Sequence, residues 1–147
     1  MTTASQDLSL KLFVVLTRAH RSMEEHARRD IERTGLGQTE FSILDILYHK
    51  GQLTIGQIGA RALLTSGSMT YVVDKLEERG LVVRKPCPED HRARYIDLTP
   101  EGRRLMGRIF PGHAAVLDRA AAALTSDEKR QAIELLKKLG LAAAREL

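Results

Sequence analysis

Cationic side chains are concentrated between residues 79 and 94, where only Glu89 and Asp90 oppose them. The five cations are Arg79, Arg84, Lys85, Arg92 and Arg94. Guanidinium and ammonium groups form charge-assisted hydrogen bonds with anionic oxygens, so this density suits a polyanion. The net charge of +4 agrees with such a partner, although many ordinary domains are mildly basic.

A hydroxyl-rich segment precedes these cations. Four of its side chains can hydrogen-bond to bases or phosphates from a helix in a major groove: Ser68, Thr70, Tyr71 and Lys75. Thr65 and Ser66 come first and form a predicted N-cap, which would present hydroxyl and backbone N–H groups to a phosphate. Together with the cations, this segment predicts contact with double-stranded DNA.

The cations at 84–94 fall on a predicted hairpin beside that helix. Arg84, Lys85, Asp90, Arg92 and Arg94 are the candidate DNA contacts there, and its arginines suit the negative potential of a narrow minor groove. An acid is unusual on such a loop. We expect the Asp90 carboxylate to orient the guanidinium of Arg92 or Arg94; the alternative is a plain turn residue.

The elements that must position these side chains follow from periodicity. Apolar residues at three- and four-residue steps predict a long helix over 7–33, and further helices are predicted at about 39–49 and 55–61, the last with Leu53-Thr54 opening it. A fourth helix extends to Arg79, because Met69, Val72, Val73 and Leu76 recur at i, i+3, i+4 and i+7. Gly80 ends it.

The rest of the chain predicts a hairpin and two helices. Strands are expected at 81–84 and 93–98, joined by a loop at 86–90 that its prolines exclude from a ladder. Thr99 and Pro100 begin a helix toward Leu124, which Pro111-Gly112 should kink or break. Thr125-Ser126-Asp127-Glu128 is a capping box for a final helix to about Ala144.

Residues 36–105 resemble the MarR family of bacterial transcription regulators. The matching pieces are Phe41 to Leu47, Leu53-Thr54, Ile58, Thr65, Val73-Asp74-x-Leu76-Glu77, Gly80-Leu81-Val82, Asp90-x-Arg92-x-Arg94 and Leu98-Thr99-x-x-Gly102. The resemblance implies a mostly α (α+β) fold, a winged helix-turn-helix with a two-stranded β-wing. It covers about half of the chain.

The resemblance also implies an organisation and a function. One domain is expected over 1–147, with the DNA-binding part at 36–105 and dimerisation helices at 7–34 and 112–147. The implied protein is a homodimer that binds a near-palindromic operator, usually as a repressor. Many members release DNA when a small aromatic or phenolic compound binds, and some respond to oxidants.

An effector pocket is expected where the first, second and fifth helices meet the winged helix. Its candidate walls are Phe13, Leu16, His20, Phe41, Leu44 and Tyr48, with ordinary core as the alternative for most of them. Cys87 is the only cysteine and lies near Lys85, whose charge would favour a reactive thiolate; the alternative is a loop thiol without a role.

Other site types are not predicted. Of His20, Glu24 and His26 in the first helix, only His20 and Glu24 share a face, so we expect no metal site. We also expect no cofactor. No window has the apolar length of a membrane span, and the single cysteine suits a reducing interior; a cytoplasmic protein is expected.

Three other classes of function compete with a specific regulator. An enzyme is not expected, because no nucleophile elbow, phosphate-binding glycine loop or paired-acid cluster can be placed. A non-specific architectural DNA protein of the same fold is the main alternative, and the ratio of specific to random-duplex affinity separates the two. A protein-interaction module built on the first helix would bind no duplex.

Overall fold

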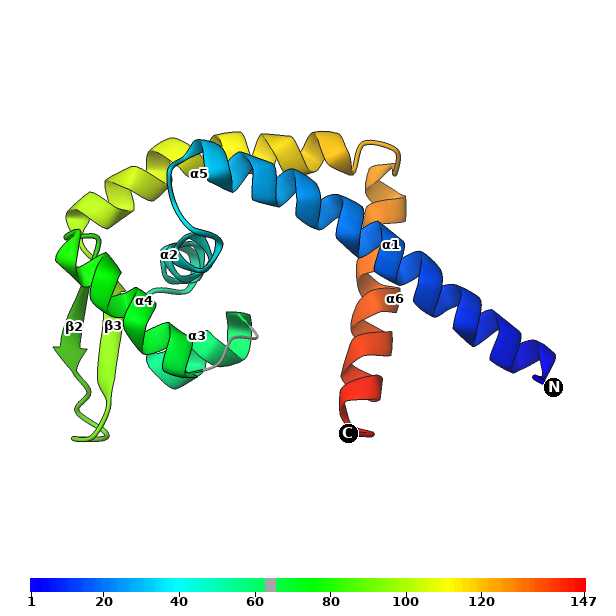
Figure 1. The fold of residues 1–147 in the computed structure, drawn as a ribbon, viewed down its shortest axis with the longest axis horizontal. Coiled ribbons are helices and arrows are strands. Elements are labelled where there is room, and N and C mark those ends of the chain that lie inside the picture. Colours follow the sequence, from blue (N-terminus) through cyan, green and yellow to red (C-terminus); the bar gives the residue numbers. More distant parts are fainter. Residues whose placement is uncertain (63–65) are drawn as a thin grey trace.

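The computed structural model describes residues 1–62 and 66–147. Along these residues the elements are α1 (Ala4–Arg33), α2 (Gln38–Lys50), β1 (Leu53–Thr54), α3 (Ile55–Ala62), α4 (Ser66–Glu78), β2 (Val82–Pro86), β3 (Arg94–Leu98), α5 (Pro100–Ala120) and α6 (Ser126–Ala144). Figure 1 shows α2, α3, α4 and the small sheet gathered at one end, with α5 and α1 running from it toward α6. The predicted winged-helix class is confirmed.

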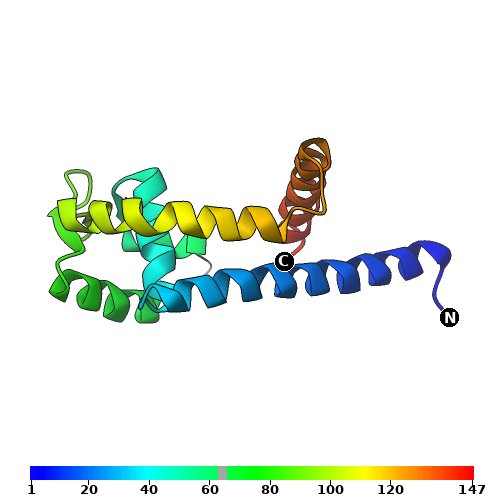
Figure 2. The same cartoon turned by 90° about the horizontal axis from the view of Figure 1, so that it is seen from above.

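Helix α1 is packed at only one of its ends. Thr3 and Gln6 close a reciprocal capping box at its start, and its one buried residue is Ile31, near its end. The C-terminal part packs along α5 and against α2, whereas the N-terminal half extends away from the winged helix (Figure 2). The sequence pattern thus predicted the helix correctly, but this chain alone does not cover its apolar stripe.

The core lies between α2, α3, α4 and the sheet. Met69, Val73 and Leu76 of α4 are fully buried, as their spacing predicted, and they pack with Leu44 of α2 and Ile58 of α3. Full burial of each such side chain stabilises the fold by about 1.5–3 kcal/mol. This packing leaves the opposite face of α4 exposed.

The sheet contains a strand that the sequence pattern did not predict. Leu53-Thr54 directly precedes the third helix, as expected, and it also pairs antiparallel with β3, giving the strand order β1-β3-β2. A segment of two residues is too short to show the alternation typical of a strand, so the sequence could not predict it. Its strand conformation comes from pairing with β3. Thr54 nevertheless caps α3, since its hydroxyl accepts from Gln57 N at 3.2 Å.

Two boundaries near prolines differ from expectation. Strand β2 continues through Pro86, which pairs with Arg94 as the last rung, so a proline placed in the predicted loop ends the ladder instead. Helix α5 is continuous through Pro111, so of the two outcomes expected there, a kink or a break, the break is wrong. The missing Pro111 N–H costs one hydrogen bond, and α1 packs along α5 across this region.

The caps of the last two helices are confirmed. Thr99 accepts from Gly102 N at 3.0 Å at the start of α5, and its hydroxyl donates to Gly80 O at 2.6 Å. Thr125 and Glu128 form the predicted capping box of α6. The Thr99 contacts hold the start of α5 against the end of α4, which fixes the wing between them.

Candidate nucleic-acid interface

The outer face of α4 carries the predicted base-reading side chains. Ser68, Thr70 and Lys75 are exposed, and Tyr71 is 60% exposed although it is aromatic. Thr65 lies outside the described residues, and α4 begins at Ser66. From Ser68 to Lys75 the structure therefore leaves a polar face of α4 open, opposite the buried face.

Tyr71 and Lys75 act as a pair on this face. The Lys75 ammonium lies 4.9 Å from the Tyr71 ring centroid, one helical turn away, in a cation–π arrangement. Contact with the Tyr71 side chain is the largest cause that raises the pKa of Lys75. The pair presents an aromatic hydroxyl and a fixed cation side by side.

Arg84 is held against α4 by two carboxylates of that helix. Its guanidinium bonds to Asp74 Oδ1 at 2.6 Å and to Glu77 Oε1 at 2.9 Å, and its backbone N–H donates to Glu77 Oε2 at 3.2 Å. The side chain is only 24% exposed. Arg84, which remains a predicted DNA contact, thus joins β2 to α4.

Of the three remaining wing cations, one is paired with a carboxylate and two are not. Lys85 reaches across to β3, where its ammonium lies 2.9 Å from Asp97 Oδ2. Arg92 and Arg94 are exposed, and among the described residues neither guanidinium forms an ion pair. The cations of the wing that are available to a phosphate are therefore those at or next to its tip.

Asp90 does not orient a guanidinium. Its carboxylate accepts from the Arg92 backbone N–H at 2.9 Å, and its carbonyl accepts from Ala93 N at 3.1 Å. The expectation of a charge-assisted bond is corrected: Asp90 is the turn residue that the alternative described, because its short carboxylate reaches the backbone two residues on. It shapes the loop that carries Arg92.

We expect the Arg84→Gln change to weaken operator binding without removing a phosphate contact. The wing would lose its tie to α4, and Asp74 and Glu77 would be left as unpaired carboxylates beside an anionic duplex. Affinity measured by fluorescence anisotropy should fall, and the slope of log K against log salt concentration should decrease by less than the value for a lost phosphate contact. Arg92→Gln is the comparison, with a slope smaller by about 0.9. If Arg84→Gln lowers the salt slope by the same amount as Arg92→Gln, Arg84 contacts a phosphate.

Cys87 is enclosed in the loop of the wing, directly after the last rung of the hairpin. It is 7% exposed, and its thiol donates to Glu89 Oε2 at 3.2 Å, the atom that also accepts from the Tyr95 hydroxyl at 2.9 Å. The Cys87 bond, and then the Tyr95 bond, lower the pKa of Glu89, and the Glu89 carboxylate raises the pKa of Tyr95 to about 12. Lys85, the expected activating cation, is bound to Asp97 instead.

This enclosure predicts an unreactive thiol. In the folded protein, Cys87 should react with iodoacetamide at least about tenfold more slowly than in the urea-unfolded chain, because reactive cysteines are exposed and this one is buried. Mass spectrometry of timed, quenched samples measures both rates. The Glu89→Ala variant, which opens the cluster, should react faster. Equal rates in the folded and unfolded states would show that the folded protein does not protect the Cys87 thiol.

The six candidate effector-pocket residues do not come together in this chain. Phe13 is 68% exposed and lies with Leu16 in a groove between α1 and α6, while His20 is exposed beside Glu24. Phe41 and Leu44 are buried in the winged-helix core. Tyr48 packs on Phe110, with ring centroids 6.0 Å apart. Helical periodicity grouped residues that the long first helix separates in space.

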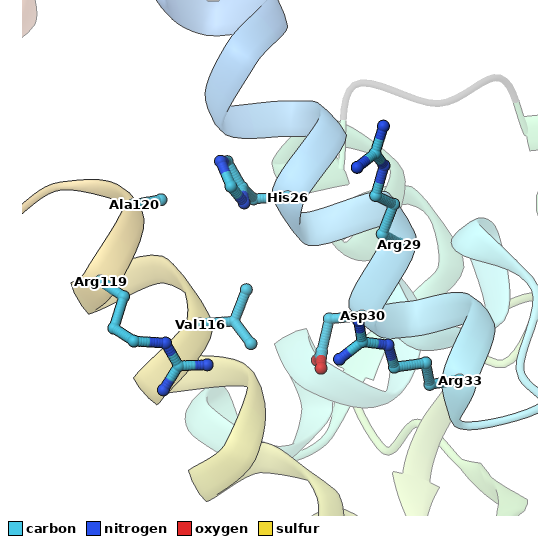
Figure 3. A pocket seen from close by; sticks show the side chains of 7 residues that line it. All are labelled: His26, Arg29, Asp30, Arg33, Val116, Arg119 and Ala120. Atoms are coloured by element: carbon cyan, nitrogen blue, oxygen red, sulfur yellow. The ribbon is translucent and has the colours of Figure 1, made fainter.

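A different cavity, of about 490 Å³, lies between the end of α1 and the end of α5 (Figure 3). It is lined by His26, Arg29, Asp30, Arg33, Val116, Arg119 and Ala120. Beside it, His113 Nδ1 lies 2.9 Å from Asp30 Oδ2, and the His113 ring packs on Phe41 with centroids 4.6 Å apart. Sequence reasoning missed this site, because residues 83 positions apart carry no shared pattern.

Among the residues that the structure describes, no group of three or more histidine, cysteine, aspartate or glutamate side chains could hold a metal ion. Among the helices in the described part of the chain, none has the length and hydropathy to cross a bilayer.

Comparison with known proteins agrees with this geometry. A family model, that of the MarR family, matches residues 36–93. The HTH-type transcriptional regulator MhqR of Bacillus subtilis is 47% identical over 135 residues, which are 92% of this chain and 93% of that protein.

Two solved structures share the fold. Sco3205, a MarR family regulator from Streptomyces coelicolor solved in complex with DNA, matches with a TM-score of 0.78 and 23% identity, over 97% of this chain and 90% of its own. BpsR of Bordetella bronchiseptica, whose DNA binding is regulated by 6-hydroxynicotinic acid, matches with a TM-score of 0.76 and 22% identity, over 88% and 98%.

Proposed function

The chain belongs to the MarR family of transcription regulators, and from this premise we propose that it is a homodimeric repressor that binds a near-palindromic operator. The observation that carries the proposal is the exposed polar face of α4 beside the exposed arginines of the wing. In this reading α4 enters the major groove and places Ser68, Thr70, Tyr71 and Lys75 against base edges or phosphates. Arg92 and Arg94 reach the adjacent minor groove.

Uncovered apolar surface supports the homodimer. Leu8, Leu12, Phe13 and Val15 of α1 are about half exposed or more, and Leu135, Leu136 and Leu141 of α6 are similarly open to solvent. Between these two helices lies an apolar groove of about 550 Å³. Apolar patches of this kind on a small protein are usually covered by a partner. A second copy of the chain would cover them, with 7–34 and 112–147 as the dimerisation segments.

A small aromatic effector is the proposed input. The regulation of BpsR by 6-hydroxynicotinic acid supports an input of this kind in a protein of the same fold. Oxidation at Cys87 is the weaker input, because the thiol is buried and already hydrogen-bonded.

Selection of bound sequences from random duplex DNA tests the proposal, with sedimentation velocity on the same sample. We expect an inverted repeat with half-sites about 34 Å apart and a dimer at the concentrations used for binding. A monomer that binds the selected repeat would contradict the dimer. Equal affinity for selected and random duplexes at physiological salt would show the architectural alternative instead. Binding to no duplex would refute both.

A further inference from the structure

Glu89 is the second acid in the loop of the wing, and its carboxylate bonds to two side chains. One oxygen, Oε2, accepts from the Cys87 thiol at 3.2 Å and from the Tyr95 hydroxyl at 2.9 Å. No cation among the described residues forms an ion pair with this carboxylate. Its charge would repel the phosphates that the wing is proposed to approach, so the charge by itself opposes DNA binding.

The loop of the wing consists of two successive turns that share one residue. The Asp90 N–H donates to Cys87 O at 3.2 Å and closes the first turn, in which Pro88 fixes one φ angle. The Asp90 carbonyl then accepts from Ala93 N at 3.1 Å and closes the second turn, which contains Arg92. The orientation of the second turn therefore depends on how the first turn is held.

Glu89 lies inside the first turn and connects that turn to the sheet. Cys87 is the first residue of the turn, whereas Tyr95 belongs to β3, the central strand of the order β1-β3-β2. Because both donors meet at the same oxygen, the carboxylate holds the turn against the central strand. The thiol is buried, so water has little access to that end of the bond.

We propose that Glu89 is a positioning residue for DNA binding: its carboxylate fixes the two turns on β3 and so holds Arg92 and Arg94 toward the minor groove. The inference rests on the proposed function and deepens it, because it gives an acid a role in binding a polyanion. Without the carboxylate, the turns would have to be ordered when DNA binds, which lowers affinity. Ordering acts on two guanidinium groups, whereas the repulsion comes from one exposed carboxylate that salt screens.

Fluorescence anisotropy with the selected operator compares two changes of the same side chain. Glu89→Ala removes the charge and the acceptor, and it should weaken operator binding at least about fivefold, although the loss of charge alone predicts tighter binding. Glu89→Gln removes only the charge, because the amide oxygen can replace Oε2, where both bonds are made. This variant should bind at least as tightly as the unmodified protein. Tyr95→Phe keeps the charge but removes one donor, and it should weaken binding at least about twofold.

Two controls separate positioning from charge. Glu78→Ala removes an exposed acid from the end of α4, where the carboxylate forms no ion pair with the described residues, and it should not weaken binding. In a protein that already carries Arg92→Gln and Arg94→Gln, Glu89→Ala should change affinity less than twofold, because no guanidinium is left to be positioned. A fivefold loss in that background would show that Glu89 does not act through the arginines. Thermal melting checks that each variant is folded.

Amide hydrogen exchange without DNA tests the turns themselves. In Glu89→Ala, the Asp90 and Ala93 N–H groups that close the two turns should exchange at least about threefold faster. Glu89→Gln should restore the slower rates. Unchanged exchange in both Glu89→Ala and Tyr95→Phe would show that the carboxylate does not hold the turns, and the inference would be wrong.

Operator binding by the unmodified protein keeps the two proposals distinguishable. If it binds the selected duplex and Glu89→Ala binds equally well or more tightly, the inference is wrong and the regulator stands. If Glu89→Gln weakens binding as much as Glu89→Ala, the charge and not the acceptor is required, which overturns the inference as well. If the unmodified protein binds no duplex, the proposed function fails, and the inference fails with it whatever the exchange rates are.

Discussion

Replacing Arg92 and Arg94 by alanine is expected to abolish most of the operator affinity while the protein stays folded. Both side chains are exposed at the tip of the wing, and in the described chain neither is used in an ion pair. Each arginine that reaches a groove contributes about 1–3 kcal/mol, so each single change should cost roughly five- to 150-fold and the double change more. Electrophoretic mobility shift or anisotropy with the selected operator measures this.

The salt dependence and a matched variant make this result specific. The slope of log K against log salt concentration should decrease by about 0.9 for each arginine that contacts a phosphate. Lys85→Ala removes a cation from the same hairpin, but one already bonded to Asp97, and should have the smaller effect. If the double variant binds the operator as the unmodified protein does, the wing does not contact DNA.

The largest expected loss of stability follows the Gly102→Ala change. Gly102 is buried where the start of α5 lies on the start of β2, and a Cβ there would overlap the Leu81 carbonyl oxygen. The same carbon would lie 3.0 Å from the Leu81 carbonyl carbon and 3.3 Å from Leu98 Cδ2. The obstacle is backbone, and Leu81 O also accepts from Thr99 N at 3.1 Å, so it cannot move without breaking that bond.

Urea titration should show a decrease of about 3 kcal/mol in the free energy of unfolding, at the upper end for overpacking, against the 5–15 kcal/mol typical of a whole domain. Gly112→Ala is the control in the same helix. Nothing lies within 4 Å of its added Cβ, so it should be neutral or stabilise by up to about 1 kcal/mol. A midpoint unchanged by Gly102→Ala would show that α5 does not approach β2 so closely.

These two sites differ in how far the sequence could predict them. The leucine–threonine–x–x–glycine spacing around Gly102 and the Asp90-x-Arg92-x-Arg94 spacing of the wing are both local, and the resemblance rested on them. The reason why residue 102 must be glycine is not local. It depends on the Leu81 carbonyl, which lies 21 positions earlier and meets α5 only once the hairpin has formed.

Local chemistry explains what the sequence by itself determined. The buried faces of α2 and α4 follow from a 3.6-residue period, and the starts of α5 and α6 follow from Thr99 and Thr125, whose hydroxyls bond to backbone N–H groups three residues later. The hairpin follows from alternation and proline. Each of these patterns depends on residues only a few positions apart, so it can be recognised in the amino-acid sequence without the tertiary structure.

Partners far apart in sequence explain what only the tertiary structure decided. Strand β1 exists because β3 offers a free edge, and α5 continues through Pro111 while α1 packs along it. Arg84 is ion-paired with two carboxylates of α4, and the Asp90 carboxylate accepts a hydrogen bond from the backbone of its own turn. A sequence states which groups carry charge, but a charge is available to DNA or to an effector only if the fold has not already paired it.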